Sequence, residues 1–94
     1  MFIEMTILYP FSNTKKKLLE NLEKQKEELL LIDSCVKYSI YNDTYSNKII
    51  YIVKWISKDD MKDSIDRKTH RKRIEQIMNL QKFPAEVYRL EEHS

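Results

Sequence analysis

Glycine is absent from this sequence of 94 residues, and histidine, proline and cysteine are rare. Without glycine the chain cannot build the Gly-rich phosphate loops of Walker or dinucleotide-binding sites, because those backbones need residues that have no Cβ. We therefore expect neither ATP nor NAD chemistry of those kinds. The left-handed turn positions that glycine usually takes are predicted to fall on Asn13, Asn42, Asp43 and Asn47, since Asn and Asp tolerate that region best.

The lone cysteine, Cys35, excludes an intramolecular disulfide and any multi-cysteine metal site, and it is typical of a reducing compartment. His70 and His93 lie far apart and have no clustered ligands beside them, so we predict no metal site. No apolar run approaches the roughly 20 residues of a membrane span. Residues 1–10 lack the basic segment and cleavage site of a signal peptide. We expect a cytoplasmic protein with no membrane partner.

Hydrophobic periodicity predicts four strands and two helices. The strands fall at 2–9, 35–41, 48–56 and 85–91, and the helices at about 14–31 and 58–81. Ser57 is the predicted cap of the second helix. Met61 and Ile65 fall on one stripe of that helix and Ile74, Ile77 and Met78 on another, so we predict a break within 67–69. This order predicts one α+β domain, the ferredoxin-like β-α-β-β-α-β unit with an antiparallel sheet and both helices on one face.

The third predicted strand is apolar on both sides, which a sheet that is half exposed to water should not be. One side carries Ile50, Ile52 and Ile56, and the other carries Ile49, Tyr51, Val53 and Trp55. The first predicted strand is likewise apolar on both sides. Two helices can cover only one face, so we predict a homodimer in which the sheet of a second copy covers the other face. The pattern leaves open which face that is.

Three segments resemble the antibiotic-biosynthesis monooxygenase family of dimeric α/β barrels. Residues 35–43 (CVKYSIYND) resemble its second strand, 51–61 (YIVKWISKDDM) its third strand and helix start, and 84–91 (PAEVYRLE) its last strand. With the first strand and helix in order, the resemblance covers nearly the whole chain. It implies a dimeric α/β barrel with a pocket between the sheet and the helices of each subunit. It also implies a cofactor-free monooxygenase that oxidises a small aromatic, quinol or polyphenol substrate with O2.

The chain departs from that family on the second helix. Family members often carry a histidine where this sequence has Ser64, and a second histidine falls at Thr69, one position before His70. Haem degraders carry Trp and His on this helix and Asn on the first strand, at positions equivalent to Ser64, Ile74 and approximately Thr6, so we do not expect haem degradation. We predict His70 as the general base, because histidine titrates near neutral pH, with Ser64 as the second catalytic candidate. The departures keep a non-catalytic ligand-binding or stress-response dimer open as the alternative.

The predicted ligand pocket is formed by side chains of the first three predicted strands and of the second predicted helix. Trp55 and the tyrosines are also typical core residues. The predicted lining is Thr6, Tyr38, Tyr51, Trp55, Met61 and Ile65.

The basic cluster at 67–73 raises the alternative of RNA binding, because RNA-recognition motifs share the predicted order of elements. Their third strand needs a basic-Gly-aromatic-Gly-aromatic core, which 48–55 lacks. The whole chain has 17 basic and 15 acidic residues, a balance that does not indicate a polyanionic partner. We predict no nucleic-acid partner and interpret the cluster as a solvated helix face.

Overall fold

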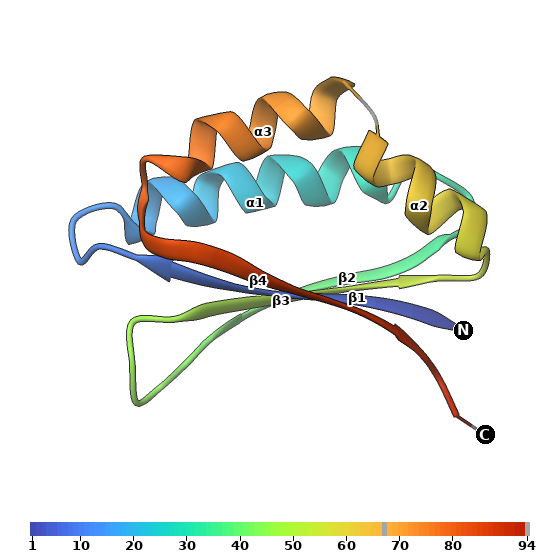
Figure 1. The fold of residues 1–94 in the computed structure, drawn as a ribbon, viewed down its shortest axis with the longest axis horizontal. Helices are drawn as coiled ribbons and strands as arrows, with labels where there is room; N and C mark the ends of the chain where they lie inside the picture. The colour runs from blue at the N-terminus through green and yellow to red at the C-terminus, as the bar shows by residue number, and fades with distance from the viewer. Residues whose placement is uncertain (67, 94) are drawn as a thin grey trace.

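The computed structural model describes residues 1–66 and 68–93, with the side chains of 65, 66 and 68–70 left out. Within these residues three helices cover one face of a four-stranded sheet and leave the other face open (Figure 1). The elements are β1 (Phe2–Pro10), α1 (Lys15–Leu29), β2 (Cys35–Asn42), β3 (Ile49–Trp55), α2 (Lys58–Asp66), α3 (Lys68–Met78) and β4 (Gln81–Glu91).

The strand order in the sheet is β2-β3-β1-β4, and every neighbouring pair is antiparallel. The two central strands, β1 and β3, are therefore neighbours in the sheet but not consecutive in the chain, because α1 and β2 lie between them in the sequence. This is the order of the ferredoxin-like unit. The predicted α+β fold class is confirmed, with the second helix of the unit divided into α2 and α3.

The core lies between the sheet and the helices. Alternate residues of each strand point to the same face, and on β3 the helix-facing set is fully or almost fully buried. Leu18 and Leu22 bring the apolar stripe of α1 onto this face, and α2 adds Met61. Trp55, with no exposed surface, anchors the end of the sheet from which α2 starts.

The predicted break in the second helix is confirmed, because α2 ends at Asp66 and α3 begins at Lys68. Arg67, inside the predicted break, lies outside the described residues, as does the side chain of Thr69. The predicted cap is also confirmed, since Ser57 Oγ accepts a hydrogen bond from the Asp60 backbone N–H at 3.3 Å.

The start of the last strand was predicted wrongly. We expected helix to Gln81 and strand only from 85, whereas α3 ends at Met78 and β4 begins at Gln81. β4 is an edge strand, where the missing N–H of Pro84 need not interrupt a ladder. Irregular register opposite Tyr9 and Pro10 accommodates the two prolines.

The prediction of left-handed Asn and Asp turns was also wrong, because no described residue has a positive φ. The turn between β2 and β3 is instead closed by side-chain hydrogen bonds. The carboxylate of Asp43 accepts from the Tyr45 N–H at 2.9 Å and from the Ser46 hydroxyl at 2.7 Å. An Asx turn of this kind needs no left-handed residue and so no glycine.

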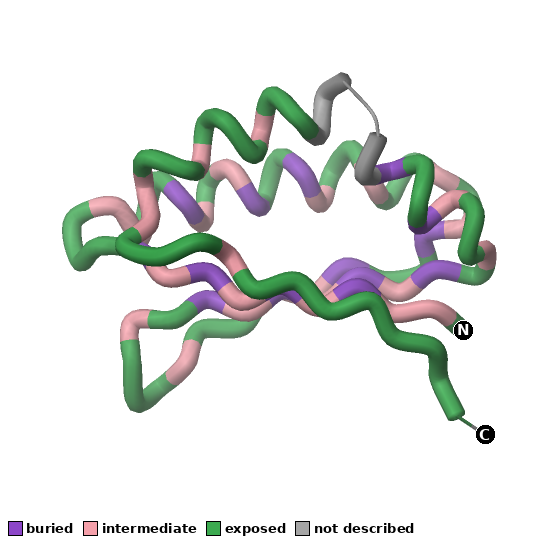
Figure 2. The backbone as a smooth tube through the Cα atoms, in the orientation of Figure 1, coloured by how far each residue is buried: buried purple, intermediate pink, exposed green. Residues whose placement is uncertain are grey.

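The open face of the sheet is apolar at its centre. Antiparallel register places Ile52, Met5 and Tyr88 side by side in one row, and Ile50 beside Ile7 in the next. These side chains are half-buried or exposed, although no element of the described chain lies over them (Figure 2). The structure thus shows which of the two apolar sides of β3 the helices leave uncovered. Across the described chain, none of the helices combines the length and apolar character needed to cross a membrane.

Candidate functional site

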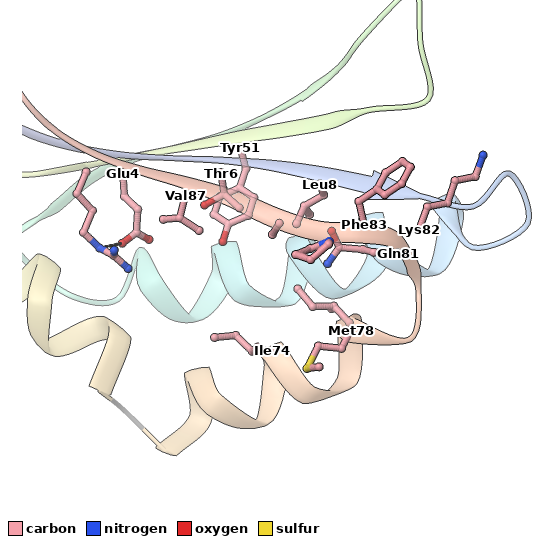
Figure 3. A pocket seen from close by; sticks show the side chains of 14 residues that line it. Glu4, Thr6, Leu8, Tyr51, Ile74, Met78, Gln81, Lys82, Phe83 and Val87 are labelled. Carbon is pink, nitrogen blue, oxygen red and sulfur yellow. Dashed lines mark ion pairs between the residues drawn. The ribbon is translucent and has the colours of Figure 1, made fainter.

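A cavity of about 520 Å³ opens between the sheet and α3, towards the start of β4 (Figure 3). Most of its wall is apolar, and the polar side chains come mainly from the sheet. Its lining residues are Glu4, Thr6, Leu8, Tyr51, Ile74, Ile77, Met78, Gln81, Lys82, Phe83, Pro84, Ala85, Val87 and Arg89.

The cavity floor is built by strand alternation. Glu4, Thr6 and Leu8 occupy alternate positions of β1 and point towards the helices (Figure 3). The ladders place Arg89 of β4 directly opposite Glu4, and Tyr51 of β3 directly opposite Thr6. One row of the sheet therefore brings a carboxylate and a guanidinium together, and the next row brings two hydroxyl groups to the same floor.

The roof comes from α3 and from the short connection to β4. Ile74, Ile77 and Met78 follow helical i, i+3, i+4 spacing, so one apolar face of α3 is turned to the cavity. The connection is held in place because the hydroxyl of Thr14 donates to the Leu80 carbonyl at 2.6 Å. The cavity thus lies under the second apolar stripe of the divided helix.

Glu4 is a buried carboxylate, with only 4% of its surface exposed. Its Oε2 lies 3.5 Å from Arg89 Nε, an ion-pair distance, but it accepts no hydrogen bond. Burial raises the pKa of Glu4, and the positive charge of Arg89 opposes that rise. The Oγ1 of Thr6 is also buried without a hydrogen-bond partner. The floor therefore holds two buried oxygen atoms, Glu4 Oε2 and Thr6 Oγ1, that accept no hydrogen bond from the described chain.

Tyr51, which lines the cavity, is backed by a second aromatic ring. The rings of Tyr51 and Tyr38 stack at a centroid distance of 5.5 Å, and the Tyr38 hydroxyl donates to Gln25 Oε1 at 2.6 Å. Burial raises the pKa of Tyr51 to about 12, and burial also raises the pKa of Tyr38. Both phenols stay protonated at neutral pH, so the hydroxyl of Tyr51 can donate a hydrogen bond to a ligand.

The residues predicted from the sequence fall into three groups. Thr6 and Tyr51 line the cavity, and Tyr38 stacks behind Tyr51. Trp55, Met61 and Ser64 are buried but do not line it, and the Ser64 hydroxyl donates to the Met61 carbonyl at 2.7 Å. The side chains of Ile65 and His70 lie outside the described residues. The roles assigned to these residues remain predictions.

Sequence reasoning missed Glu4 and Arg89. A signal for Glu4 was present, because it interrupts an apolar strand at a position that shares a face with Thr6 and Leu8. Nothing in the sequence paired it with Arg89, since that pairing depends on the register of strands that are far apart in the chain. Among the described side chains, no group of three or more His, Cys, Asp or Glu residues could hold a metal ion.

Many solved structures share this fold. Rv0793 from Mycobacterium tuberculosis superposes with a TM-score of 0.91 at 14% sequence identity, over 99% of this chain and 95% of that one. An antibiotic biosynthesis monooxygenase gives 0.88 at 12% identity over the whole of both chains. A conserved protein from Methanosarcina mazei Go1 gives 0.86 at 12% identity, over 99% and 94%. No protein-family model and no curated protein matches the sequence. The chain therefore has the fold of the antibiotic biosynthesis monooxygenases.

Proposed function

We propose that this protein binds a small aromatic, quinol or polyphenol molecule in the cavity and oxidises it with O2 without a bound cofactor. The observation that carries the proposal is the cavity itself, which combines about 520 Å³ of largely apolar space with buried polar groups on one wall. Cavities of roughly 300 to 1,000 Å³ with a few placed polar groups are typical of small-molecule sites. The fold shared with an antibiotic biosynthesis monooxygenase supports the same class of activity.

The chemistry of such an oxidation suits this cavity. A phenolate or hydroquinone anion transfers an electron to O2 far more readily than the neutral molecule does, so the protein has to bind the ring, exclude water and help to remove a proton. The apolar residues of α3 can contact the faces of an aromatic ring. Thr6, Tyr51 and Glu4 can contact its hydroxyl groups.

A second candidate function is non-catalytic binding of the same kind of ligand, as in a stress-response protein. It is favoured by the position of Ser64, which is the residue at the family's histidine position and does not line the cavity. None of the described residues that line the cavity is a histidine. His70 remains the predicted general base, and its replacement by alanine should lower an oxidation rate about 100-fold if that role is correct.

Oxygen uptake distinguishes the two functions. Protein freed of metal and flavin should consume O2 with at least one of a panel of hydroquinones and polyphenols, and the rate should rise with pH as the phenol ionises. Ala85→Phe, which adds a ring inside the cavity, should abolish uptake. Leu31→Phe, at an exposed position outside the cavity, should not. Measurable binding without any O2 uptake would replace the oxygenase with the non-catalytic function.

We also propose that the open face of the sheet is covered by the same face of a second copy. Its central residues, Met5, Ile7, Ile50, Ile52 and Tyr88, form a contiguous apolar surface, which monomeric proteins rarely expose. A chain this short also buries only about 60 to 65% of its unfolded surface when it folds alone. Sedimentation at micromolar concentration should show a particle of twice the mass of the chain, and a monomer would contradict the proposal.

A further inference from the structure

We propose that Glu4 accepts the proton of a phenolic hydroxyl bound in the cavity, and that Arg89 pairs with the phenolate that forms. In this step the O–H bond of the ligand breaks, a new O–H bond forms on the Glu4 carboxylate, and no electron leaves the site. The inference rests on the proposed function in taking the ligand to be a phenol. It does not require that the ligand is subsequently oxidised.

The first support is the unused hydrogen-bonding capacity of Glu4. A buried carboxylate normally accepts hydrogen bonds from its surroundings, because leaving a charged group unpaired in a protein interior is costly. Here Oε2 accepts none, and the cation that the described side chains place beside it, Arg89 Nε, is 3.5 Å away. Both side chains line the cavity. A hydroxyl donor that enters the cavity would supply the partner that the described chain does not.

The second support is the balance of charge. Glu4 and Arg89 form an ion pair before the ligand binds, so the floor carries no net charge. After the transfer the carboxyl group is neutral and the phenolate takes its place beside Arg89. The site therefore never buries a second uncompensated charge, which is the main obstacle to ionising a phenol away from water.

The third support is the acidity of the groups involved. A free carboxyl is normally more acidic than a phenol by about six pKa units. Burial raises the pKa of Glu4 towards that of a phenol. The same Arg89 that opposes this rise would lower the pKa of a phenol bound against it, and hydrogen bonds donated by Tyr51 and Thr6 would stabilise the phenolate further. Figure 3 shows these three hydroxyl- and carboxyl-bearing side chains, Glu4, Thr6 and Tyr51, directed from the sheet towards the same space.

The test uses 4-nitrophenol, whose phenolate absorbs visible light, with 4-nitroanisole as a probe that has no proton to lose. We expect the whole protein to bind both. In a weakly buffered solution below the pKa of the free phenol, binding of 4-nitrophenol should produce the phenolate band without releasing a proton to the solvent, because the proton stays on Glu4. This measurement needs no variant. A bound phenol that stays neutral, failure of both probes to bind, or release of one proton per phenolate would overturn the proposal.

Three variants identify the group that takes the proton and the group that pairs with the phenolate. Arg89→Gln should still bind 4-nitroanisole but reduce the ionised fraction of bound 4-nitrophenol tenfold or more. In Glu4→Gln any ionisation must release the proton to solvent, so the phenolate band should fall about tenfold for each unit of decreasing pH. Glu75→Gln, at an exposed position on α3 outside the cavity, should behave as the unaltered protein.

These variants, together with His70→Ala at the predicted general base, separate this inference from the proposed oxidation. Loss of the phenolate band in His70→Ala, together with an unaltered band and no proton release in Glu4→Gln, would transfer the role of base to the histidine. Ionisation without O2 uptake would refute the oxygenase and leave Glu4 as the proton acceptor. O2 uptake that is unaffected in Glu4→Gln would refute the role of Glu4 and leave the oxygenase.

Discussion

At the centre of β1 the two faces of the sheet differ in a way that is opposite to a typical α+β domain. The face that the helices cover carries Glu4 and Thr6 at the centre of β1, whereas the open face carries Met5 and Ile7 at the neighbouring positions. A sheet with one solvated face would place its polar residues on the open side. The difference supports the two proposals made above, a ligand site on the covered face and association through the open face.

The largest effect should come from the packed part of the covered face. Trp55→Ala is expected to lower the free energy of unfolding by about 3 to 5 kcal/mol, because it removes the largest fully buried side chain. Tyr45→Ala deletes an aromatic ring that is 98% exposed in the turn between β2 and β3, and it should change stability by less than about 0.5 kcal/mol. Urea unfolding followed by circular dichroism measures both. Equal losses would mean that Trp55 does not anchor the core.

The next effect should come from the open face. Ile52→Asp places a charge in the central row and should weaken association by about 2 kcal/mol or more, because the charge would be buried without a partner. Sedimentation should then show a monomer at concentrations where the unaltered protein is a dimer. Thr44→Asp adds the same charge at an exposed turn residue and should stay dimeric. An Ile52→Asp dimer as tight as the original would place the interface elsewhere.

Local patterns predicted most of this fold, and they failed where the outcome depended on contacts between distant segments. The rotated stripe of Ile74 and Ile77 was enough to predict that the second helix divides, because helical spacing is a local property. The start of β4 at Gln81 depends instead on pairing with Pro10, across the whole length of the chain. Thr6 and Tyr51 were proposed as pocket residues from the family resemblance and from side-chain chemistry, whereas the pairing of Glu4 with Arg89 depends on strand register and could not be predicted.

A smaller effect is expected within the covered face, where polar groups are paired. Tyr38→Phe removes the hydroxyl that donates to Gln25 and should cost about 1 kcal/mol, because a buried amide oxygen loses its partner. Tyr41→Phe is the matched control, on the same strand but half exposed on the open side. Urea unfolding should show a change in Tyr38→Phe alone. A loss of the same size in Tyr41→Phe would indicate a general effect of removing a hydroxyl from β2.

The smallest effect on stability should come from the titration of Glu4, and its sign follows from burial. The pKa of Glu4 is raised in the folded chain above the ordinary value of 4.5, mainly by burial and in spite of Arg89. Between the ordinary and the raised pKa the folded state binds more protons than the unfolded state, so this residue makes stability fall as pH rises through that window.

Glu4→Gln has no carboxyl group to titrate at this position and should lack this contribution. The free energy of unfolding of Glu4→Gln minus that of the unaltered protein should therefore increase as pH rises above the ordinary pKa of 4.5. The exposed carboxylates Asp43 and Glu86, whose pKa values are lowered by hydrogen bonds, titrate in both proteins and cancel in the difference. Urea unfolding at a series of pH values measures this difference, with Glu75→Gln expected to give none. A difference that does not change with pH would mean that the folded cavity floor leaves the acidity of Glu4 unaltered.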